Sequence, residues 1–274
     1  MDDDQFKRLL DALDLSWQGY RKVRKGIKKR LSRHMEQTGC RSVEDYVKRI
    51  GNRTETRLLM TVSTSRFFRD RTLWKALEEK IIPEILSRSP DRVRVWSAGC
   101  ALGQEVYSFR MLWEFMKMTQ DILPALFLLA TDIHPEYLRR AIEGEYRTAD
   151  MRAVPDDIRD QCLALGGDRY VVSERLRSDI SWEIYDLTDS PDYPDSFQII
   201  FLRNSLLTYY KQNIQEAALP RIVDNLAGGG YLIVGLRERL PAAYPALVRS
   251  DAHPCIYSKE DSPNSGTGPF QARS

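Results

Sequence analysis

The fold is decided by the stretch Val93–Tyr107, V-R-V-W-S-A-G-C-A-L-G-Q-E-V-Y, in which an apolar strand pattern passes through a glycine-containing turn into a helix. The branched run ends at Trp96, Gly99 and Gly103 allow tight turning of the backbone, and a helical pattern begins at Gln104. Proteins of the α/β class build nucleotide pockets in this way. Because the glycines form G-x-x-x-G and not the dinucleotide fingerprint G-x-G-x-x-G, a purely structural turn also fits this stretch.

Strand and helix patterns alternate outward from this stretch. The apolar runs expected to form strands are Val93–Trp96, Leu126–Thr131, Phe197–Leu202 and Gly230–Gly235. The helical patterns are Leu73–Ser87, Gln104–Lys117, Pro135–Glu143 and Gln212–Leu226, the last ending in Gly228-Gly229-Gly230. Because helices separate successive strands, we predict an α/β fold with a doubly wound, mostly parallel sheet over residues 91–260.

Two segments depart from this alternation. Arg169–Ser173 and Ile180–Leu187 are short strand patterns separated by a polar turn. They predict a small antiparallel β hairpin subdomain, about residues 166–187, inserted in the larger fold. The tail, residues 261–274, has the composition of a disordered segment.

The N-terminal region carries the basic charge of the chain. Residues 17–57 contain thirteen Lys or Arg against four acidic residues, which gives +9, whereas the whole chain has a net charge of +2. Apolar residues recur at helical spacing, so residues 1–60 are predicted to form a basic all-helical domain. Ser42 and Asp45 resemble a capping box before a helix through Ile50. Residues 61–90 are predicted to be a linker and a helix.

Composition excludes several classes of protein. No apolar run approaches bilayer length, and the acidic start at Met1–Asp4 lacks the pattern of a secretory signal, so we expect a cytoplasmic protein. The cysteines form no C-x-x-C pair and the histidines are scattered, so no metal site is expected. These residues are Cys40, Cys100, Cys162, Cys255, His34, His134 and His253.

Two acidic residues follow the first two predicted strands and indicate a nucleoside ligand. Asp132 fits the hydroxyls of a ribose, although a helix cap before Pro135 is an alternative. These residues leave nicotinamide cofactors and S-adenosylmethionine as candidates. Glu105 at the start of a helix disfavours a phosphate and suits a cationic ligand, so the residues favour S-adenosylmethionine.

A second polar group lies at the junction of the basic region and the sheet. Thr61–Asp70 contains hydroxyls, two arginines and the pair Phe67 and Phe68. These side chains suit a pocket edge that stacks an adenine and binds a carboxylate through a guanidinium. An interdomain hinge with a core phenylalanine pair explains them equally well.

Several motifs in order resemble the CheR family of chemotaxis receptor glutamate methyltransferases. They are F-F-R-D at 67–70, W-S-A-G-C-A-x-G-x-E-x-Y-S at 96–108, T-D-I at 131–133, G-x-Y at 144–146, F-L-R-N at 201–204 and G-G-Y-L-I-V-G at 229–235. The similarity extends from about Tyr20 to Ser258. It implies an S-adenosylmethionine-dependent enzyme with a Rossmann-like fold that converts receptor glutamates into methyl esters.

The resemblance also implies roles for particular residues. Glu105 would hold the methionine amino group of the cofactor, Asp132 its ribose, and Asp186 with Leu187 would flank the adenine. Arg69 could in addition anchor the acceptor carboxylate. The predicted cofactor-binding residues are Ser63, Ser65, Arg69, Gly99, Glu105, Asp132, Asp186, Leu187, Arg203 and Asn204, and the predicted catalytic residues are Arg69 and Tyr209.

The chain departs from the family pattern mainly at the acceptor end of the site. The tyrosine that family members carry five residues after the arginine of R-N falls on Thr208, so Tyr209 would replace it only after a one-residue shift. The turn after Gly103 reads Gln104-Glu105-Val106 instead of E-E-P, and G-H-S-E reads Gly235-Leu236-Arg237-Glu238.

We therefore expect an O-methyltransferase acting on glutamates of chemoreceptor-like proteins. The expected protein is a monomer that reaches membrane receptors peripherally, through the basic N-terminal domain and the β subdomain. A methyltransferase with another acceptor, or a non-catalytic docking module that binds S-adenosylmethionine, remains open. Stable nucleic-acid binding is not expected, because few aromatic residues lie among the basic ones.

Overall fold

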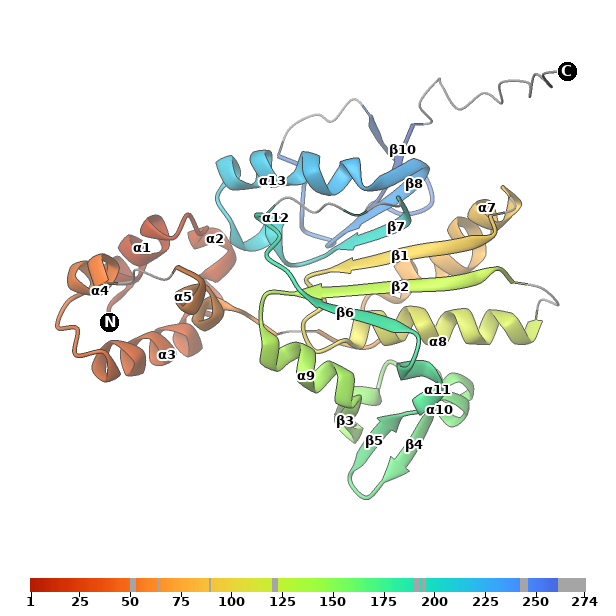
Figure 1. Cartoon of the computed structure of the whole chain (residues 1–274), viewed down its shortest axis with the longest axis horizontal. Coiled ribbons are helices and arrows are strands. Elements are labelled where there is room, and N and C mark those ends of the chain that lie inside the picture. Colours follow the sequence, from red (N-terminus) through yellow and green to blue (C-terminus); the bar gives the residue numbers. More distant parts are fainter. Residues whose placement is uncertain are drawn as a thin grey trace, which may run out of the picture.

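A seven-stranded sheet lies at the centre of the computed structural model, which describes residues 1–49, 53–63, 65–88, 90–119, 123–189, 193, 196–241 and 246–260 (Figure 1). From edge to edge the strands are β6 (Ile180–Ile184), β2 (Ala125–Asp132), β1 (Arg92–Ala98), β7 (Phe197–Leu202), β8 (Leu226–Val234), β10 (Ile256–Lys259) and β9 (Leu247–Arg249). The first five run parallel, and β10 is antiparallel to both of its neighbours. The predicted α/β fold with a mostly parallel sheet is confirmed.

Helices cover both faces of the sheet because β1 is apolar on both sides. Val93 and Val95 pack in one core, and Trp96 and Ala98 pack in a second core. The helices on the first face are α6 (Arg71–Ala76), its π-helical continuation (Leu77–Ile81), α7 (Ile82–Ser87) and α8 (Gln104–Thr119). The helix α13 (Gln212–Asp224) covers the second face, and α9 (Pro135–Glu143) lies beside β2 and β6 (Figure 1).

The N-terminal helices have a core of their own. They are α1 (Asp3–Ala12), α2 (Trp17–Tyr20), α3 (Arg24–Gln37), α4 (Val43–Arg49) and α5 (Arg53–Met60). Phe6, Ile27 and Leu31 are buried in this core, as the helical spacing indicates. Ser42 caps α4 by accepting a hydrogen bond from the Asp45 N–H at 3.0 Å. Ile50 lies outside the described residues.

Backbone hydrogen bonds attach these helices to the segment after β7, which contains the short helix α12 (Leu206–Tyr209). The Ser16 N–H donates to the carbonyl of Tyr209 at 2.8 Å, and the Lys211 N–H donates to the carbonyl of Asp14 at 2.9 Å. Leu15 and Tyr210 form an antiparallel bridge between these two bonds. The N-terminal helices are thereby held beyond the carboxyl ends of the central strands (Figure 1).

The inserted β subdomain is present, but its predicted strand pairing is wrong. A separate antiparallel sheet has the order β3 (Glu145–Arg147), β5 (Arg169–Val172) and β4 (Leu163–Gly166). The strand β6, which was expected to pair with β5, lies parallel to β2 at the edge of the main sheet. The helix α11 (Glu174–Arg177) separates β5 from β6 and redirects the chain.

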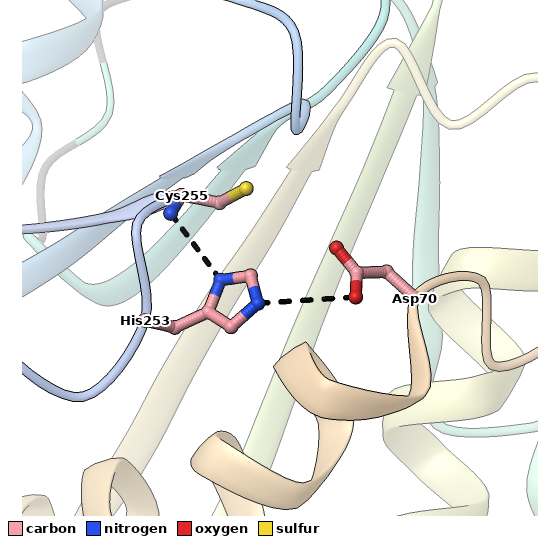
Figure 2. A group of neighbouring side chains, drawn as sticks. All are labelled: Asp70, His253 and Cys255. Atoms are coloured by element: carbon pink, nitrogen blue, oxygen red, sulfur yellow. Dashed lines mark hydrogen bonds and ion pairs between the residues drawn. The ribbon is translucent and has the colours of Figure 1, made fainter.

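Smaller differences concern the C-terminal part of the chain. The helix α13 ends at Asp224, and the glycines 228–230, expected to terminate it, belong to β8. The turn before β10 places His253 and Cys255 beside Asp70, which precedes α6 (Figure 2). Among the described residues, no helix is long and apolar enough to cross a membrane. The predicted disordered tail, 261–274, lies outside the described residues.

Candidate active site

A cavity opens at the carboxyl ends of β1, β2 and β7, where the strand order of the sheet reverses. It contains about 1070 Å³ of empty space, part of it open to solvent, which suits a small-molecule ligand. The predicted site residues that line it are Ser65, Arg69, Gly99, Glu105, Asp132, Asp186, Leu187, Arg203, Asn204 and Tyr209. Ser63 lines an adjacent cavity instead. The structure thus brings most of the predicted residues together, and their roles toward a ligand stay predictions.

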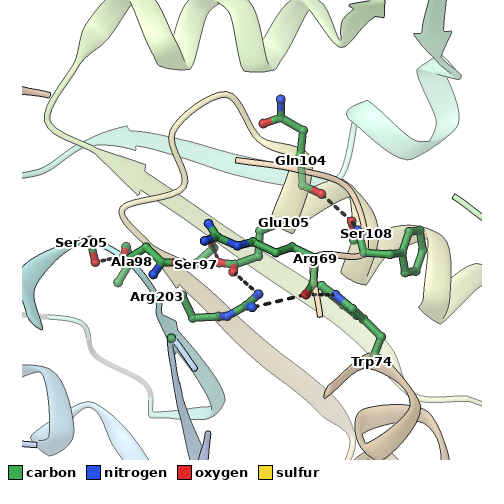
Figure 3. A network of polar contacts seen from close by, with 12 residues as sticks. Arg69, Trp74, Ser97, Ala98, Gln104, Glu105, Ser108, Arg203 and Ser205 are labelled. Carbon is green, nitrogen blue, oxygen red and sulfur yellow. Dashed lines mark hydrogen bonds and ion pairs between the residues drawn. The ribbon is translucent and has the colours of Figure 1, made fainter. Parts of the chain in front are cut away.

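Glu105 is held in an ion pair at the floor of this cavity. Its Oε2 accepts a hydrogen bond from Arg203 Nη1 at 3.1 Å, and its Oε1 accepts one from Ser97 Oγ at 2.8 Å (Figure 3). Both partners of the ion pair are largely buried. Because a carboxylate has about four acceptor positions, two remain for a ligand. Glu105 therefore has a fixed position and still has acceptor positions available for a ligand.

Arg69 adds a second guanidinium to the cavity. Its carbonyl accepts hydrogen bonds from Trp74 Nε1 at 3.0 Å and from Arg203 Nη2 at 3.3 Å (Figure 3). Burial lowers the pKa of the Arg69 guanidinium, and the nearby charges of Arg203 and Arg66 lower this pKa further. The Glu105 carboxylate opposes this shift, and an anionic ligand group beside Arg69 would offset the repulsion between the guanidinium groups.

The glycine turn after β1 comes close to the end of β2. The N–H groups of Gly99 and Cys100 both donate to the carbonyl of Thr131 at 2.9 Å. Gly99 has φ +88°, and a Cβ there would lie 2.8 Å from Ser205 Cβ. Only glycine fits this position without displacement of its neighbour.

Asp132 binds two backbone N–H groups and also faces the cavity, and its role toward a ribose stays a prediction. Its carboxylate accepts hydrogen bonds from the Ala101 N–H and from the His134 N–H, both at 2.9 Å, so it stabilises the glycine turn and the start of α9. It also lines the cavity. Burial raises the pKa of the Asp132 carboxyl, and the two backbone donors oppose this shift.

Asp186 is bound to a residue that sequence reasoning missed. Arg57 Nη1, from α5, donates to Asp186 Oδ2 at 2.6 Å, and both side chains are mostly buried. Thr188 donates to Asp186 Oδ1 through its backbone N–H at 2.9 Å and its hydroxyl at 2.8 Å. The pairing joins residues 129 positions apart, so the local sequence contains no signal for it. Tyr20 of α2, Met60 of α5 and Leu15, which lies between α1 and α2, also line the cavity.

The departure at Thr208 is accommodated by a buried carboxylate. The Thr208 hydroxyl donates to Glu238 Oε1 at 2.5 Å, and Glu238 Oε2 accepts from the N–H groups of Asn204 at 3.0 Å and Gly235 at 2.6 Å. Burial raises the pKa of Glu238. The next residue, Tyr209, lines the cavity, and its ring centroid lies 5.0 Å from that of Tyr20.

Comparisons with known proteins agree with this geometry. Residues 63–251 match the family model for the CheR methyltransferase, SAM binding domain. A chemotaxis protein methyltransferase from Listeria monocytogenes is 35% identical over 189 residues, which cover 68% of this chain and 70% of that protein. Chemotaxis protein methyltransferase 1 from Pseudomonas aeruginosa is 34% identical over 224 residues, which cover 78% of this chain and 81% of that protein. The chain therefore belongs to the CheR family of methyltransferases, and its cofactor is S-adenosylmethionine.

Proposed function

We propose that the chain is a protein-glutamate O-methyltransferase that acts on chemoreceptor-like proteins. The observation that carries this proposal is one cavity in which the carboxylates of Glu105 and Asp132 lie with the guanidinium of Arg69. The Glu105 carboxylate suits the amino group of the cofactor, the Asp132 carboxylate suits its ribose hydroxyls, and a guanidinium suits an anionic acceptor. The names of the relatives support the same class of acceptor.

The residues of the cavity fit S-adenosylmethionine. Glu105 would hold the amino group of its methionine part, and Asp132 would hold its ribose. The turn at Gly99 also lines the cavity, and its lack of a Cβ lets Ser205 pack against it. Leu187 and Asp186 would border the adenine, with Asp186 held in place by Arg57.

The chemistry requires positioning more than proton transfer. A glutamate side chain with a reference pKa of ~4.3 is already ionised at neutral pH, so no general base is needed. The bound cofactor supplies a methyl group on a sulfonium; the glutamate oxygen takes this methyl group, and the sulfur keeps the electron pair of the broken bond. Arg69 would orient the carboxylate in line with that bond.

Exposed positive charge on α3 supports an acidic protein partner. Lys25, Lys29 and Arg33 are exposed and spaced four residues apart, so they form one stripe along a face of α3, and the exposed Arg21 lies just before this helix. We propose that this basic stripe docks on an acidic receptor surface, with the sheet β3–β5 as a second contact. The cytoplasmic location, the monomeric state and the domain boundaries remain predictions.

A labelled-methyl assay with cytoplasmic membranes that contain chemoreceptors tests the proposed function. We expect label to enter membrane protein and to be released as methanol in mild alkali, because carboxyl methyl esters are hydrolysed there. Alkali-stable label would show a different acceptor. Cofactor binding by calorimetry without any label transfer would indicate a docking module instead.

A further inference from the structure

Arg69 lies between two residues in the left-handed backbone region. The angle φ is +44° at Phe68 and +71° at Asp70. Residues other than glycine rarely adopt this region, and such a turn persists only where surrounding contacts hold it. The presentation of Arg69 to the cavity therefore depends on the contacts that hold this turn.

Polar contacts hold the turn on both sides of Arg69. Before it, the Phe68 N–H donates to Ser108 Oγ of α8 at 2.9 Å. After it, Asp70 Oδ1 accepts a hydrogen bond from Thr72 Oγ1 at 2.9 Å. Asp70 Oδ2 is buried and has no hydrogen-bond partner among the described residues. The Asp70 carboxylate thus depends on its contacts at Oδ1.

His253 is joined to Asp70 by hydrogen bonds that pass through Thr72, and its Nε2 also faces Asp70 Oδ1 directly at 3.8 Å (Figure 2). The Cys255 N–H donates to His253 Nδ1 at 3.2 Å, so Nδ1 carries a lone pair and the neutral ring carries its proton on Nε2. Nε2 lies 3.1 Å from Thr72 Oγ1, to which it donates, and the Thr72 hydroxyl donates onward to Asp70 Oδ1. His253 is 7% exposed, so water competes little for the bonds of its ring, whereas the bond from Thr72 to Asp70 faces solvent.

We propose that His253 is a positioning residue for methyl transfer. Through Thr72 and Asp70, it fixes the backbone turn that presents Arg69 to the cavity. This inference rests on the proposed role of Arg69 at the acceptor carboxylate.

A metal site is the competing explanation for the same side chains. The ligand atoms of Asp70, His253 and Cys255 all lie within 4.8 Å of one another. A metal ion would need the lone pair of His253 Nε2, but this atom carries the ring proton when Nδ1 accepts the Cys255 N–H. Metal-bound histidines normally donate a proton from the other ring nitrogen, which this backbone donor prevents. The hydrogen-bond directions therefore favour the positioning role.

Variants at Thr72 test this chain of hydrogen bonds with little risk to folding, because Thr72 is exposed. Thr72→Val removes the bridging hydroxyl, and Thr72→Ser keeps it. We expect Thr72→Val to lower kcat roughly 10- to 100-fold, the loss that about 1 Å of misplacement causes, while Thr72→Ser stays near wild type. The shorter amide of His253→Asn can accept the Cys255 N–H but is too short to replace Nε2 beside Thr72, so this variant should resemble Thr72→Val. The longer amide of His253→Gln can donate to Thr72 and should retain more activity.

A double-mutant cycle with Arg69→Lys separates positioning from a general structural defect. If the hydrogen bonds from His253 through Thr72 to Asp70 act through Arg69, Thr72→Val should lower kcat much less in the Arg69→Lys background than in wild type. Full additivity of the two losses, or wild-type kcat and KM for Thr72→Val, would overturn the proposal.

Nuclear magnetic resonance of ¹⁵N-histidine-labelled protein tests the chain without any substrate. At about pH 7.5, we expect the His253 ring to be neutral, with its proton on Nε2. The signals of His253 are assigned as those that disappear from the spectrum of His253→Asn. A proton on Nδ1, or a shift of the His253 signals and a raised Tm on adding one equivalent of Zn²⁺, would contradict the assignment. Because this result does not require methyl transfer, it stands apart from a failure of the proposed function.

Discussion

Asp132 accepts two backbone hydrogen bonds and still lines the cavity. We predict that Asp132→Asn weakens S-adenosylmethionine binding about 10- to 100-fold, because a hydrogen bond to a charged group contributes ~1.5–3 kcal/mol. Isothermal titration calorimetry measures this change, with thermal unfolding of the cofactor-free protein as a check on folding. Asp91→Asn, at an exposed position before β1, is the matched control. An unchanged Kd would mean that Asp132 is only a structural cap.

His253 should give the protein a pH-dependent stability. Burial lowers its pKa from 6.5; Asp70 opposes this shift, Arg203 adds to it, and Thr72 and Cys255 complete its polar surroundings. Because the folded state binds the proton less readily, the stability that His253 contributes is present above about pH 6.5 and is lost as pH falls through its folded pKa.

We therefore predict that the free energy of unfolding declines less in His253→Gln than in wild type between about pH 7 and pH 5. Urea unfolding at several pH values measures the difference. Parallel curves for the two proteins would show that another group causes the decline.

At the scale of elements, the glycine turn between β1 and α8 should tolerate no side chain. Gly99→Ala places a Cβ 2.8 Å from Ser205 at φ +88°, so we expect a loss of about 1–3 kcal/mol of stability and weaker cofactor binding. Gly26→Ala is the matched control: it lies inside α3 with nothing within 4 Å and should stabilise the protein by ~0.5–1 kcal/mol. Denaturant unfolding distinguishes the two, and equal effects would refute the argument from backbone geometry.

Local sequence patterns predicted the helices and strands well, but they did not predict which strands pair with each other. The strand, turn and helix around Gly99 and the bounds of α9 follow from apolar spacing, glycine and proline. The strand β6 was recognised as a strand, but its pairing with β2 is a tertiary property that its own residues do not encode. The short helix α11 is the feature that breaks the predicted hairpin.

At the scale of the whole molecule, the cavity is completed by helices far away in the sequence. Glu105 and Asp132 were predictable because Asp132 ends β2 and Glu105 lies in the first turn of the helix after β1, both at the carboxyl ends of strands. Arg57 and Tyr20 were not, since their places beside Asp186 and Tyr209 depend on how the N-terminal helices dock. The sequence gives no role for His253, because it lies far from the other histidines, and only the fold places it beside Asp70.

The basic stripe on α3 should govern encounter with the substrate and not the chemistry. We predict that Lys25→Glu with Lys29→Glu raises KM for receptor membranes several-fold, most strongly at low salt, and leaves S-adenosylmethionine affinity unchanged. Lys75→Glu with Lys80→Glu makes the same charge change at exposed positions on another helix and serves as the control. Equal effects of both pairs would assign the loss to net charge alone.

The most direct test of the central claim is peptide mapping by mass spectrometry of chemoreceptor incubated with this protein and S-adenosylmethionine. We expect methyl esters on glutamate side chains of the receptor, and a greatly reduced yield with Arg69→Lys. Methyl groups on another residue type, or an unmodified receptor despite measured cofactor binding, would contradict it.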